Sequence, residues 1–397
     1  MQRFLAFFPL LFLAVTLAAC TSVPEKPASV ESRPLASARQ AQQSAPPPQV
    51  EITPLARTAP PEEASPPRQP APGMANNAHI ALLLPLDSPA FGRAAEAVKR
   101  GFMAAATIQA SDLPVKVYPS GGERPDDIVA AYRQATQAGA RIIVGPLTKN
   151  GVSALAASKQ VSVPTLALNL PDSFSDLPPQ LYFLSLAADI EARQIAQAAF
   201  GEGRRTAIIV ASGNSLAKRM QLAFADEWAH LGGKLVAQFG FNGTNPVAIR
   251  DAWQSHPADM LFLAMDGGDA RLLRPYLDND IPMYATSQIY AGRNTPEKYY
   301  DLNGIHFIDM PWLLQPDHLA VMVYPRPQEA FSADLERLYA LGIDAWRLAL
   351  LLQAGPAGAP FTLDGVTGRL RLNGAHQVER DGVLAVFRNG EAALLTP

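Results

Sequence analysis

Short apolar stretches alternate with amphipathic ones along most of the chain after residue 78. Residues 80–86 are almost wholly apolar, which is typical of a strand buried on both faces. Residues 91–108 then repeat apolar positions every three or four residues, which predicts an amphipathic helix. Strands that alternate with helices in this way predict a parallel sheet with helices on both faces. Further strands are predicted at 115–118, 141–144, 164–168 and 181–186, and further helices at 126–137 and 151–159.

The pattern begins again at residue 190 and changes in the last third of the chain. Helices are predicted at 190–200, 215–231 and 246–254, and strands at 207–210, 235–239, 260–264, 282–285 and 305–308. A long helix is predicted at 331–352, followed by short antiparallel strands at 365–372 and 383–387 with Gly turns. Two successive series indicate an α/β fold of two lobes, each a doubly wound and mostly parallel sheet.

The first twenty residues read as a targeting segment. The apolar run at 4–17 is shorter than the roughly 20 residues that a bilayer-spanning helix needs. The sequence then continues Leu-Ala-Ala-Cys20, which resembles the lipobox of bacterial lipoproteins, where the cysteine thiol accepts a diacylglyceryl group. We expect residues 1–19 to be a signal peptide and Cys20 to be the lipidated N-terminus. The alternative is an ordinary signal peptide with a chance cysteine. The next residue is Thr21 rather than Asp, which by the sorting rule of Gram-negative lipoproteins implies an outer-membrane anchor.

Residues 20–77 have the composition of a linker. Thirteen prolines lie between residues 21 and 77, and Ser, Ala and Gln fill most of the gaps between them. Five acidic residues balance five basic ones in the same stretch. Such a segment buries too little apolar surface to fold, so we expect a disordered tether. The alternative is that its proline clusters are ligands for a partner that binds polyproline II helices.

Charge and cysteine content exclude several classes of protein. The 397 residues carry 33 Lys and Arg against 36 Asp and Glu, without a basic stripe, so no nucleic-acid partner is expected. The single cysteine excludes an internal disulfide and a Cys-rich zinc site. The six histidines show no metal-binding spacing, and no metal or cofactor is expected.

The sequence contains no motif of nucleophilic or nucleotide chemistry. A Gly-x-Ser-x-Gly elbow, a Walker A loop and a Gly-x-Gly-x-x-Gly turn after a strand are all absent. Asp266 and Asp269 flank a Gly-Gly pair after an apolar strand, but turn chemistry accounts for them more simply than catalysis does. We therefore expect a protein that is not an enzyme.

Polar residues that directly follow predicted strands are the candidates for a binding cleft. Ligands of doubly wound lobes lie beyond the carboxyl ends of the strands, here the crevice between the lobes. The candidates are Thr148, Lys149, Asn150, Asn169, Asp266, Ser287 and Gln288. Thr148 or Asn150 could instead cap the helix that follows. Amino-acid receptors usually hold the carboxylate of their ligand with small hydroxyl residues at a helix N-terminus. Lys149 and Asn150 are not hydroxyl residues. Two interpretations stay open, a small-molecule cleft and a degenerate cleft reused as a rigid scaffold.

Four segments carry a resemblance to a known family. They are 80–86 with the glycines at 92 and 101, the strand and turn at 142–147, Tyr-Ala-Leu-Gly-Ile-Asp-Ala-Trp-Arg-Leu at 339–348, and Leu-Asp-Gly-Val-Thr-Gly-Arg-Leu at 363–370. Over about residues 79–390 the chain resembles a type I periplasmic-binding-protein module. Within that superfamily it resembles the penicillin-binding-protein activator lipoproteins of the LppC family. Many periplasmic binding proteins share the first two segments, whereas the last two are more specific to the activators.

The resemblance implies a module of residues 78–397 in which the chain crosses between the lobes three times. It places 79–185 and 316–355 in lobe 1, and 186–315 and 356–397 in lobe 2. In the longer activators a helical-repeat domain precedes this module, at the place where this chain has its Pro-rich segment.

The resemblance also implies a partner. In the family that the chain resembles, this module engages and stimulates a class A (bifunctional) penicillin-binding protein, which polymerises and crosslinks peptidoglycan. On this interpretation the chain is an outer-membrane lipoprotein that faces the periplasm and regulates peptidoglycan synthesis. The alternative is a periplasmic solute receptor that binds an amino acid, peptide or cell-wall fragment between its lobes. The outer-membrane sorting residue favours the first, because a transport receptor must deliver its solute to an inner-membrane permease.

Overall fold

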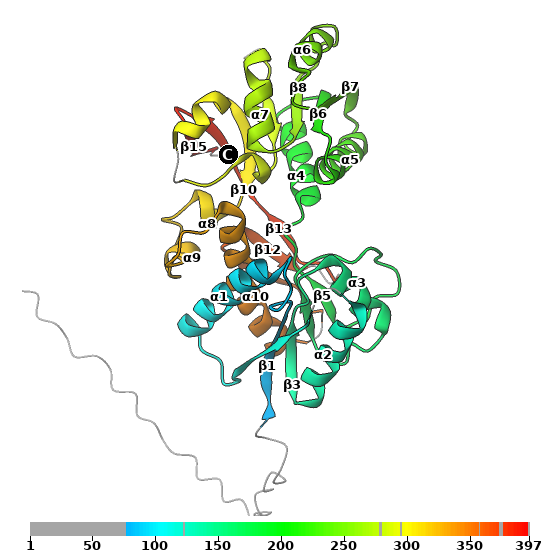
Figure 1. The fold of residues 1–397 in the computed structure, drawn as a ribbon, viewed down its shortest axis with the longest axis vertical. Coiled ribbons are helices and arrows are strands. Elements are labelled where there is room, and N and C mark those ends of the chain that lie inside the picture. The colour runs from blue at the N-terminus through cyan, green and yellow to red at the C-terminus, as the bar shows by residue number, and fades with distance from the viewer. Residues whose placement is uncertain are drawn as a thin grey trace, which may run out of the picture. The chain divides into compact units, whose positions relative to one another are not determined.

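The computed structural model describes residues 77–395 except 122–123, 278–279, 294–295, 357 and 373–375. Its described strands form sheets of five, seven and three strands (Figure 1). Cys20, the predicted signal peptide and all but the last residue of the predicted linker lie outside the described residues. We call the region built on the five-stranded sheet the first lobe, and the region built on the seven-stranded sheet the second lobe.

The sheet of the first lobe is entirely parallel. Its strands lie in the order β2-β1-β3-β4-β5, so the chain starts near the middle of the sheet and is wound in both directions. The strands are β1 (His79–Leu84), β2 (Val115–Pro119), β3 (Ala140–Val144), β4 (Thr165–Ala167) and β5 (Leu181–Phe183). The helices that pack on this sheet are α1 (Gly92–Ile108), α2 (Pro125–Gln137), α3 (Lys149–Ser158) and α10 (Ala333–Ala354).

Alternate side chains of β1 explain the two helical layers. Ile80, Leu82 and Leu84 belong to the core that includes α1 and α10, whereas Ala81 and Leu83 belong to the core under α2 and α3. All five side chains are fully buried. Burial of each large aliphatic side chain contributes about 1.5–3 kcal/mol, so the apolar run of β1 stabilises helices on both faces of the sheet.

Helices α1 and α10 cross at very close range because each has a glycine at the contact. A Cβ atom on Gly101 would overlap the backbone of α10, and one on Gly342 would overlap the backbone of α1. Beside the crossing the rings of Phe102 and Trp346 pack edge to face, with centroids 5.2 Å apart. Two of the features that carry the family resemblance, Gly101 and the segment 339–348, therefore meet at this helix crossing.

The sheet of the second lobe is parallel through five strands and antiparallel at one edge. Its order is β15-β14-β10-β9-β8-β6-β7, and β14 runs antiparallel to β10. The strands are β6 (Thr206–Ser212), β7 (Lys234–Phe241), β8 (Met260–Ala264), β9 (Met283–Ala285), β10 (Ile305–Asp309), β14 (Val383–Arg388) and β15 (Glu391–Leu394). An Asn-Gly turn, one of the predicted Gly turns, closes the last hairpin, with positive φ at both Asn389 and Gly390.

Helices cover both faces of the second sheet as well. They are α4 (Ala188–Gly201), α5 (Ser215–His230), α6 (Pro246–Gln254) and α7 (Gly267–Leu273), with 3-10 turns at Arg274–Tyr276, Ser287–Ile289 and Pro296–Leu302. Ala207 and Ile209 of β6 belong to the core with α4 and α5, whereas Ile208 and Val210 belong to the core with α6 and α7. Successive side chains of β6 thus point to opposite faces of the sheet, as they do along β1.

Segments between the two large sheets join the lobes. One lies between β10 and α10 and contains the short helices α8 (Pro311–Leu314) and α9 (Leu319–Met322). Another follows α10 and contains the three-stranded sheet of β11 (Phe361–Asp364), β12 (Arg369–Leu372) and β13 (Glu379–Asp381). Figure 1 shows β12 and β13 between the lobes. One cluster of buried apolar side chains includes Val98 of the first lobe and Ile208 of the second, so the lobes share a core.

Prediction and structure differ in the short elements. The pair Asp266 and Asp269, predicted as a turn, lies at the start of helix α7. The predicted strand 365–372 begins only at Arg369, because residues 365–368 form a turn. Strands β11 and β13 are missing from the prediction, because three or four residues with charged side chains carry too little periodicity to indicate a strand.

Candidate functional site at the boundary of the two lobes

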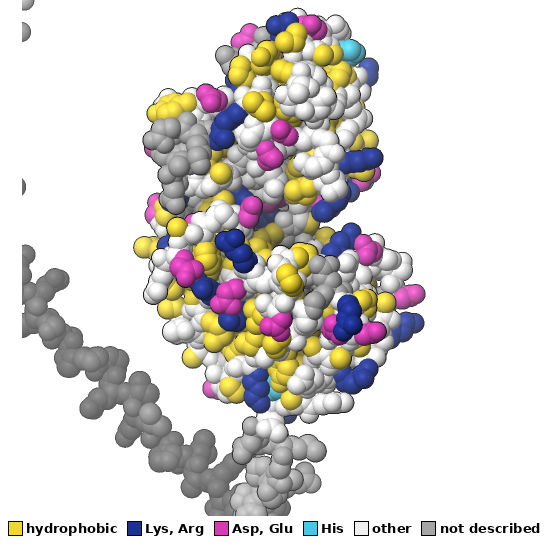
Figure 2. All heavy atoms as spheres, in the orientation of Figure 1, with side chains coloured by type: hydrophobic (Ala, Val, Ile, Leu, Met, Phe, Trp, Pro, Cys, Tyr) yellow, Lys and Arg dark blue, Asp and Glu magenta, His cyan; other side chains and the backbone are white. Residues whose placement is uncertain are grey.

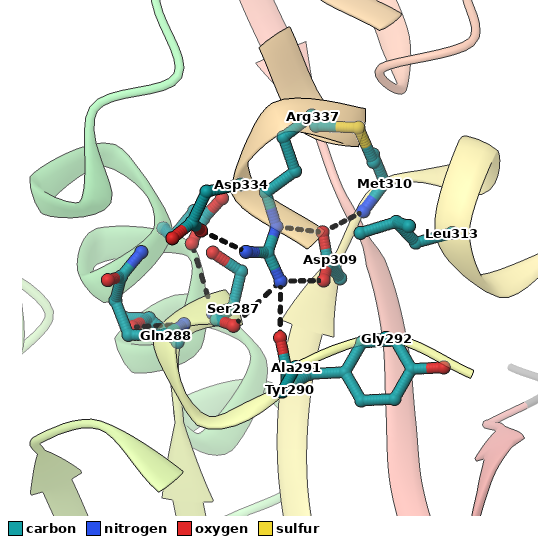
Figure 3. Close-up of polar contacts among 12 residues, drawn as sticks. Ser287, Gln288, Tyr290, Ala291, Gly292, Asp309, Met310, Leu313, Asp334 and Arg337 are labelled. Atoms are coloured by element: carbon teal, nitrogen blue, oxygen red, sulfur yellow. Dashed lines mark hydrogen bonds and ion pairs between the residues drawn. The ribbon is translucent and has the colours of Figure 1, made fainter. Parts of the chain in front are cut away.

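An arginine of α10 and an aspartate of the second sheet meet in the interior of the protein. Asp309 is the last residue of β10. Nε of Arg337 donates to Oδ1 of Asp309 at 3.2 Å, and Nη2 donates to Oδ2 at 2.7 Å (Figure 3). The Arg337 side chain is 8% exposed and the Asp309 side chain 0%. This bidentate ion pair therefore connects the two lobes where water is excluded.

Both terminal nitrogens of the Arg337 guanidinium also bind groups other than Asp309. Nη2 donates to the carbonyl oxygens of Ser287 at 3.0 Å and Tyr290 at 2.8 Å, and Nη1 donates to the Asp334 carboxylate at 2.7 Å (Figure 3). The backbone N–H of Met310 donates to Asp309 at 2.8 Å. Buried charges persist in proteins when they are paired and hydrogen-bonded in this way.

A second buried ion pair shares Ser287 with the first. Glu191 of α4 accepts a hydrogen bond from Nη2 of Arg380, on β13, at 2.9 Å, and both side chains are at most 3% exposed. Glu191 also accepts from the backbone N–H of Ser287 at 3.1 Å. Because the Ser287 N–H binds one ion pair and the Ser287 carbonyl binds the other, the four charged residues form one network.

A third buried carboxylate ties α10 to the turn at 365–368. Asp344 accepts hydrogen bonds from the backbone N–H groups of Val366 at 3.0 Å and Thr367 at 2.8 Å, and from the Thr367 hydroxyl at 2.7 Å. Nη1 of Arg380 donates to the carbonyl of the same Thr367 at 3.1 Å. The two segments that are specific to the activators therefore contact each other, and they do so beside the buried network.

Burial sets the electrostatics of this region. Burial raises the pKa of the Asp309 carboxyl, against the opposing effect of Arg337. Burial disfavours the charge of Arg337, but the Asp309 carboxylate outweighs it and raises the pKa of the guanidinium. Burial likewise raises the pKa of Asp344, against the opposing effect of Arg347. The donors around each carboxylate favour its ionised form, against the effect of burial.

The first-lobe candidates use their polar groups locally. The Thr148 hydroxyl caps α3 by accepting from the backbone N–H of Gly151 at 3.2 Å, which is the capping role left open by the sequence. Lys149 forms an ion pair of 2.8 Å with Asp172. The Asn169 amide donates to the Leu147 carbonyl at 3.1 Å, and Asn150 is exposed in the first turn of α3.

The second-lobe candidates divide between a helix cap and the buried network. Asp266 caps α7 by accepting from the backbone N–H groups of Gly268 at 2.8 Å and Asp269 at 3.0 Å. Gln288 lies in a 3-10 turn with Ser287, and only Ser287 joins the network. Within the described ranges, no hydrogen bond or ion pair joins the first-lobe candidates to the second-lobe ones.

Sequence reasoning missed the charged residues of the network and the neighbouring Asp344. Asp309 ends an apolar strand and Asp344 lies inside an apolar helix, and a charge in such a setting is the signal that could have identified both. Glu191 has no such signal, because acidic residues are ordinary in the first turn of a helix.

The hydrogen bonds and ion pairs of the site connect parts of the protein to one another. No three His, Cys, Asp or Glu side chains in the described ranges are placed to bind a metal ion. No helix of the described part of the chain is long and apolar enough to span a bilayer. In Figure 2 basic and acidic side chains are interspersed over the visible face, without a large area of one sign.

Two doubly wound lobes joined at a shared core define a periplasmic-binding-protein-like module. The chain matches the model of the LppC lipoprotein family over residues 73–252 and 246–390, and it belongs to this family. The C-domain of LpoA from Haemophilus influenzae, described as a regulator of PBP1A, is 25% identical, with a TM-score of 0.66 over 80% of this chain and 100% of that one. A structure from Chromobacterium violaceum, described as a branched-chain amino acid ABC transporter, is 39% identical, with a TM-score of 0.69 over 78% of this chain and 100% of that one.

Curated relatives match in sequence as well. The penicillin-binding protein activator LpoA of Pantoea ananatis is 29% identical over 71% of this chain and 47% of its own length. The LpoA of Yersinia pseudotuberculosis is 26% identical over 80% of this chain and 61% of its own length. The chain thus spans about half to three fifths of the length of these relatives.

Proposed function

We propose that this protein is a periplasm-facing lipoprotein of the outer membrane that binds and activates a class A penicillin-binding protein and so regulates peptidoglycan synthesis. The observation that carries the proposal is the likeness of residues 73–390 to proteins named penicillin-binding protein activators and to an LpoA domain described as a regulator of PBP1A. The chain acts as a binding partner rather than an enzyme, because these relatives are named for activation and not for a reaction.

The buried network supports a rigid scaffold rather than a receptor that closes on a solute. A receptor needs free polar groups in its cleft and lobes that move about a hinge. Here Thr148 and Asn169 bind their own lobe, and Ser287 binds both ion pairs. Separation of the lobes would leave Arg337 and Asp309 unpaired, at a cost of several kcal/mol. A partner protein would therefore meet a surface of fixed shape.

The test uses the chain from residue 20 onward with Cys20→Ala, which lacks the lipid. We expect it to capture a purified class A penicillin-binding protein and to raise the rate at which that enzyme polymerises and crosslinks lipid-linked precursor. A monofunctional penicillin-binding protein is the control and is expected to be neither captured nor activated. A folded protein that neither binds the class A enzyme nor changes its rate would contradict the proposal.

The anchor is tested separately in cells. Palmitate should label the wild-type protein and not the Cys20→Ala variant, because the thiol is the acceptor of the lipid. Thr21→Asp should leave the lipid in place and move the protein to the inner membrane. Labelling of the Cys20→Ala variant would contradict the lipidation, and a Thr21→Asp protein that stays in the outer membrane would contradict the sorting.

The segment 20–77 serves in this proposal as a tether between the membrane and the lobes. As a flexible coil it would span about 40 Å, and as extended polyproline II roughly 180 Å. Deletion of half of residues 28–72 should therefore reduce activation in cells, whereas an equally long scrambled Pro/Ser/Ala sequence should preserve it. Activity that survives the deletion and is lost on scrambling would instead indicate a recognition motif among the prolines.

A solute receptor is the second candidate, because the 39% identical Chromobacterium violaceum structure is described as a branched-chain amino acid transporter. Titration of the same lipid-free protein with leucine, isoleucine and valine in a calorimeter distinguishes the two. We expect no heat of binding from an amino acid. Micromolar binding accompanied by protection of the cleft from proteolysis would favour the receptor.

A further inference from the structure

A cavity lies beside the segment that joins β10 to α10. Its volume is about 290 Å³, near the lower end of the range of small-molecule pockets. Apolar groups form much of its wall, and two arginines line it together. The lining residues used below are Arg293, Trp312, Leu313, Arg326, Phe331 and Glu336.

Both arginines are held in place by consecutive carbonyl groups of α8. Nη1 of Arg326 donates to the Trp312 carbonyl at 2.8 Å, and its guanidinium stacks on the Trp312 ring at 3.8 Å from the centroid. Nε of Arg293 donates to the Leu313 carbonyl at 2.6 Å. A guanidinium has five N–H donors, so each arginine keeps donors beyond those that hold it.

The acidic groups around the cavity do not balance both arginines. Glu336 is 3.5 Å from Arg326 and accepts from Nε1 of Trp312 at 3.1 Å. Glu329, which also lines the cavity, pairs with Arg100 at 2.9 Å. Within the described ranges, Arg293 has no carboxylate at ion-pair distance. Burial lowers the pKa of Arg326, and the nearby charge of Arg293 lowers it further against the effect of Glu336. The lining therefore carries two arginines and two glutamates, but Glu329 is shared with Arg100, and Arg293 is left without a carboxylate partner among the described residues.

We propose that this cavity binds a carboxylate attached to a small apolar or aromatic group. The planar guanidinium donors of Arg293 and Arg326 match a carboxylate geometrically, and charge-assisted hydrogen bonds of this kind are the strong ones. Leu313 and Phe331 supply the apolar contact for the rest of the ligand. Arg293 and Leu313 also line a neighbouring cavity of about 270 Å³, which gives room for a longer ligand. The site is independent of the proposed activation, since nothing in its recognition chemistry involves a synthase.

A carboxylate of this kind can come from a free organic acid or from the C-terminus of a peptide. The test titrates the lipid-free Cys20→Ala protein by calorimetry with benzoate and with the dipeptide glycyl-leucine. Benzamide and glycyl-leucine amide are the matched neutral probes. We expect at least one carboxylate to bind at millimolar concentration or tighter, and its amide to bind about tenfold or more weakly. Benzoate binding alone would assign a free acid as the ligand, and dipeptide binding alone would assign a peptide terminus.

Two variants locate the site. Arg326→Gln and Arg293→Gln should each weaken carboxylate binding about tenfold or more, because each removes charged donors. Arg293→Gln is the safer variant, since among the described residues this side chain bonds only to the Leu313 carbonyl. Circular dichroism checks that both variants fold. Arg250→Gln, on the exposed face of α6, is the control and should bind like the parent. Equal affinity for acid and amide, full affinity in the Arg293→Gln protein, or no binding of either carboxylate would each overturn the proposal.

Discussion

Arg337 and Arg326 lie near the same joining segment but are held in opposite ways. The Arg337 side chain is 8% exposed, and a carboxylate with no exposure binds it through two nitrogens. The Arg326 side chain is 41% exposed, and a carbonyl and an indole ring hold it, with its nearest carboxylate only at 3.5 Å. A guanidinium in the interior needs a full set of protein partners, whereas one at a cavity wall can keep donors for a ligand.

This difference separates two roles for charge in the module. A buried ion pair is weak evidence for stability, because the cost of removing two charges from water is comparable to their attraction. Its geometry is nevertheless specific, and here that geometry fixes α10 of one lobe against β10 of the other. We infer that the network sets how the lobes are joined, while the exposed arginines remain available for recognition.

Breaking the buried pair from one side should have the largest effect. Arg337→Met leaves Asp309 buried without its main donor, and we expect a loss of about 3–5 kcal/mol in the free energy of unfolding, measured by urea denaturation. The double variant Arg337→Met with Asp309→Leu removes both charges and should recover most of that loss. A double variant as unstable as the single one would show that packing, and not the unpaired charge, accounts for the effect.

Asp344 sharpens the comparison, because backbone N–H groups rather than a bidentate arginine hold this buried carboxylate. Asp344→Asn should cost about 1–3 kcal/mol, since it replaces one accepting oxygen by an NH2 donor that faces the N–H and O–H donors of Val366 and Thr367. Burial raises the pKa of Asp344, so the folded protein keeps a proton that the unfolded chain has already released. The advantage of wild type over the variant should therefore decrease as pH rises from the unfolded pKa to the folded pKa. Parallel urea titrations across that window check the sign, and an advantage that grows with pH would contradict it.

Regular periodicity made the sheets predictable. The continuous apolar run of β1 indicates a strand buried on both faces, and the repeat along α1 indicates a helix and its buried face. Gly101 and Gly342 appeared in the sequence as parts of motifs, but only the structure shows that they face each other's helix. Local pattern therefore predicts elements well, whereas a contact between elements leaves no periodic trace.

The candidate site was less predictable for the same reason. Glu191 and Arg380 are 189 residues apart, and no local pattern links them. The rule that ligands lie beyond strand ends selected Thr148 and Asp266, yet a polar residue there can face the crevice or cap its own helix. Both cap their helices. Ser287 is the exception. It joins the network through its backbone N–H and carbonyl groups, which a list of candidate side chains cannot reveal.

The exposed arginine should matter far less for stability than the buried one. Arg326→Met keeps apolar contact with Trp312 and loses a partly exposed hydrogen bond to the Trp312 carbonyl, a cation–π contact and a long ion pair. We expect a loss of about 1 kcal/mol, well below that of Arg337→Met. Urea denaturation in parallel with Arg337→Met measures the ratio of the two effects directly. A loss as large as that of Arg337→Met would remove the contrast and make Arg326 part of the structural connection.

The smallest effect is expected at Asp259, an exposed carboxylate with backbone donors like those of Asp344. It accepts from the N–H groups of Arg205 and Thr206, both at 2.9 Å, and these hydrogen bonds lower its pKa. Asp259→Asn should cost less than about 1 kcal/mol at neutral pH, because water competes for the same donors. Here the folded protein releases its proton before the unfolded chain does, so the stabilisation is lost as pH falls through the folded pKa. The pH slope at Asp259 should thus be opposite to that at Asp344, with Asp251→Asn, which removes another exposed carboxylate, as the control. Equal slopes at the two positions would show that burial does not distinguish these carboxylates.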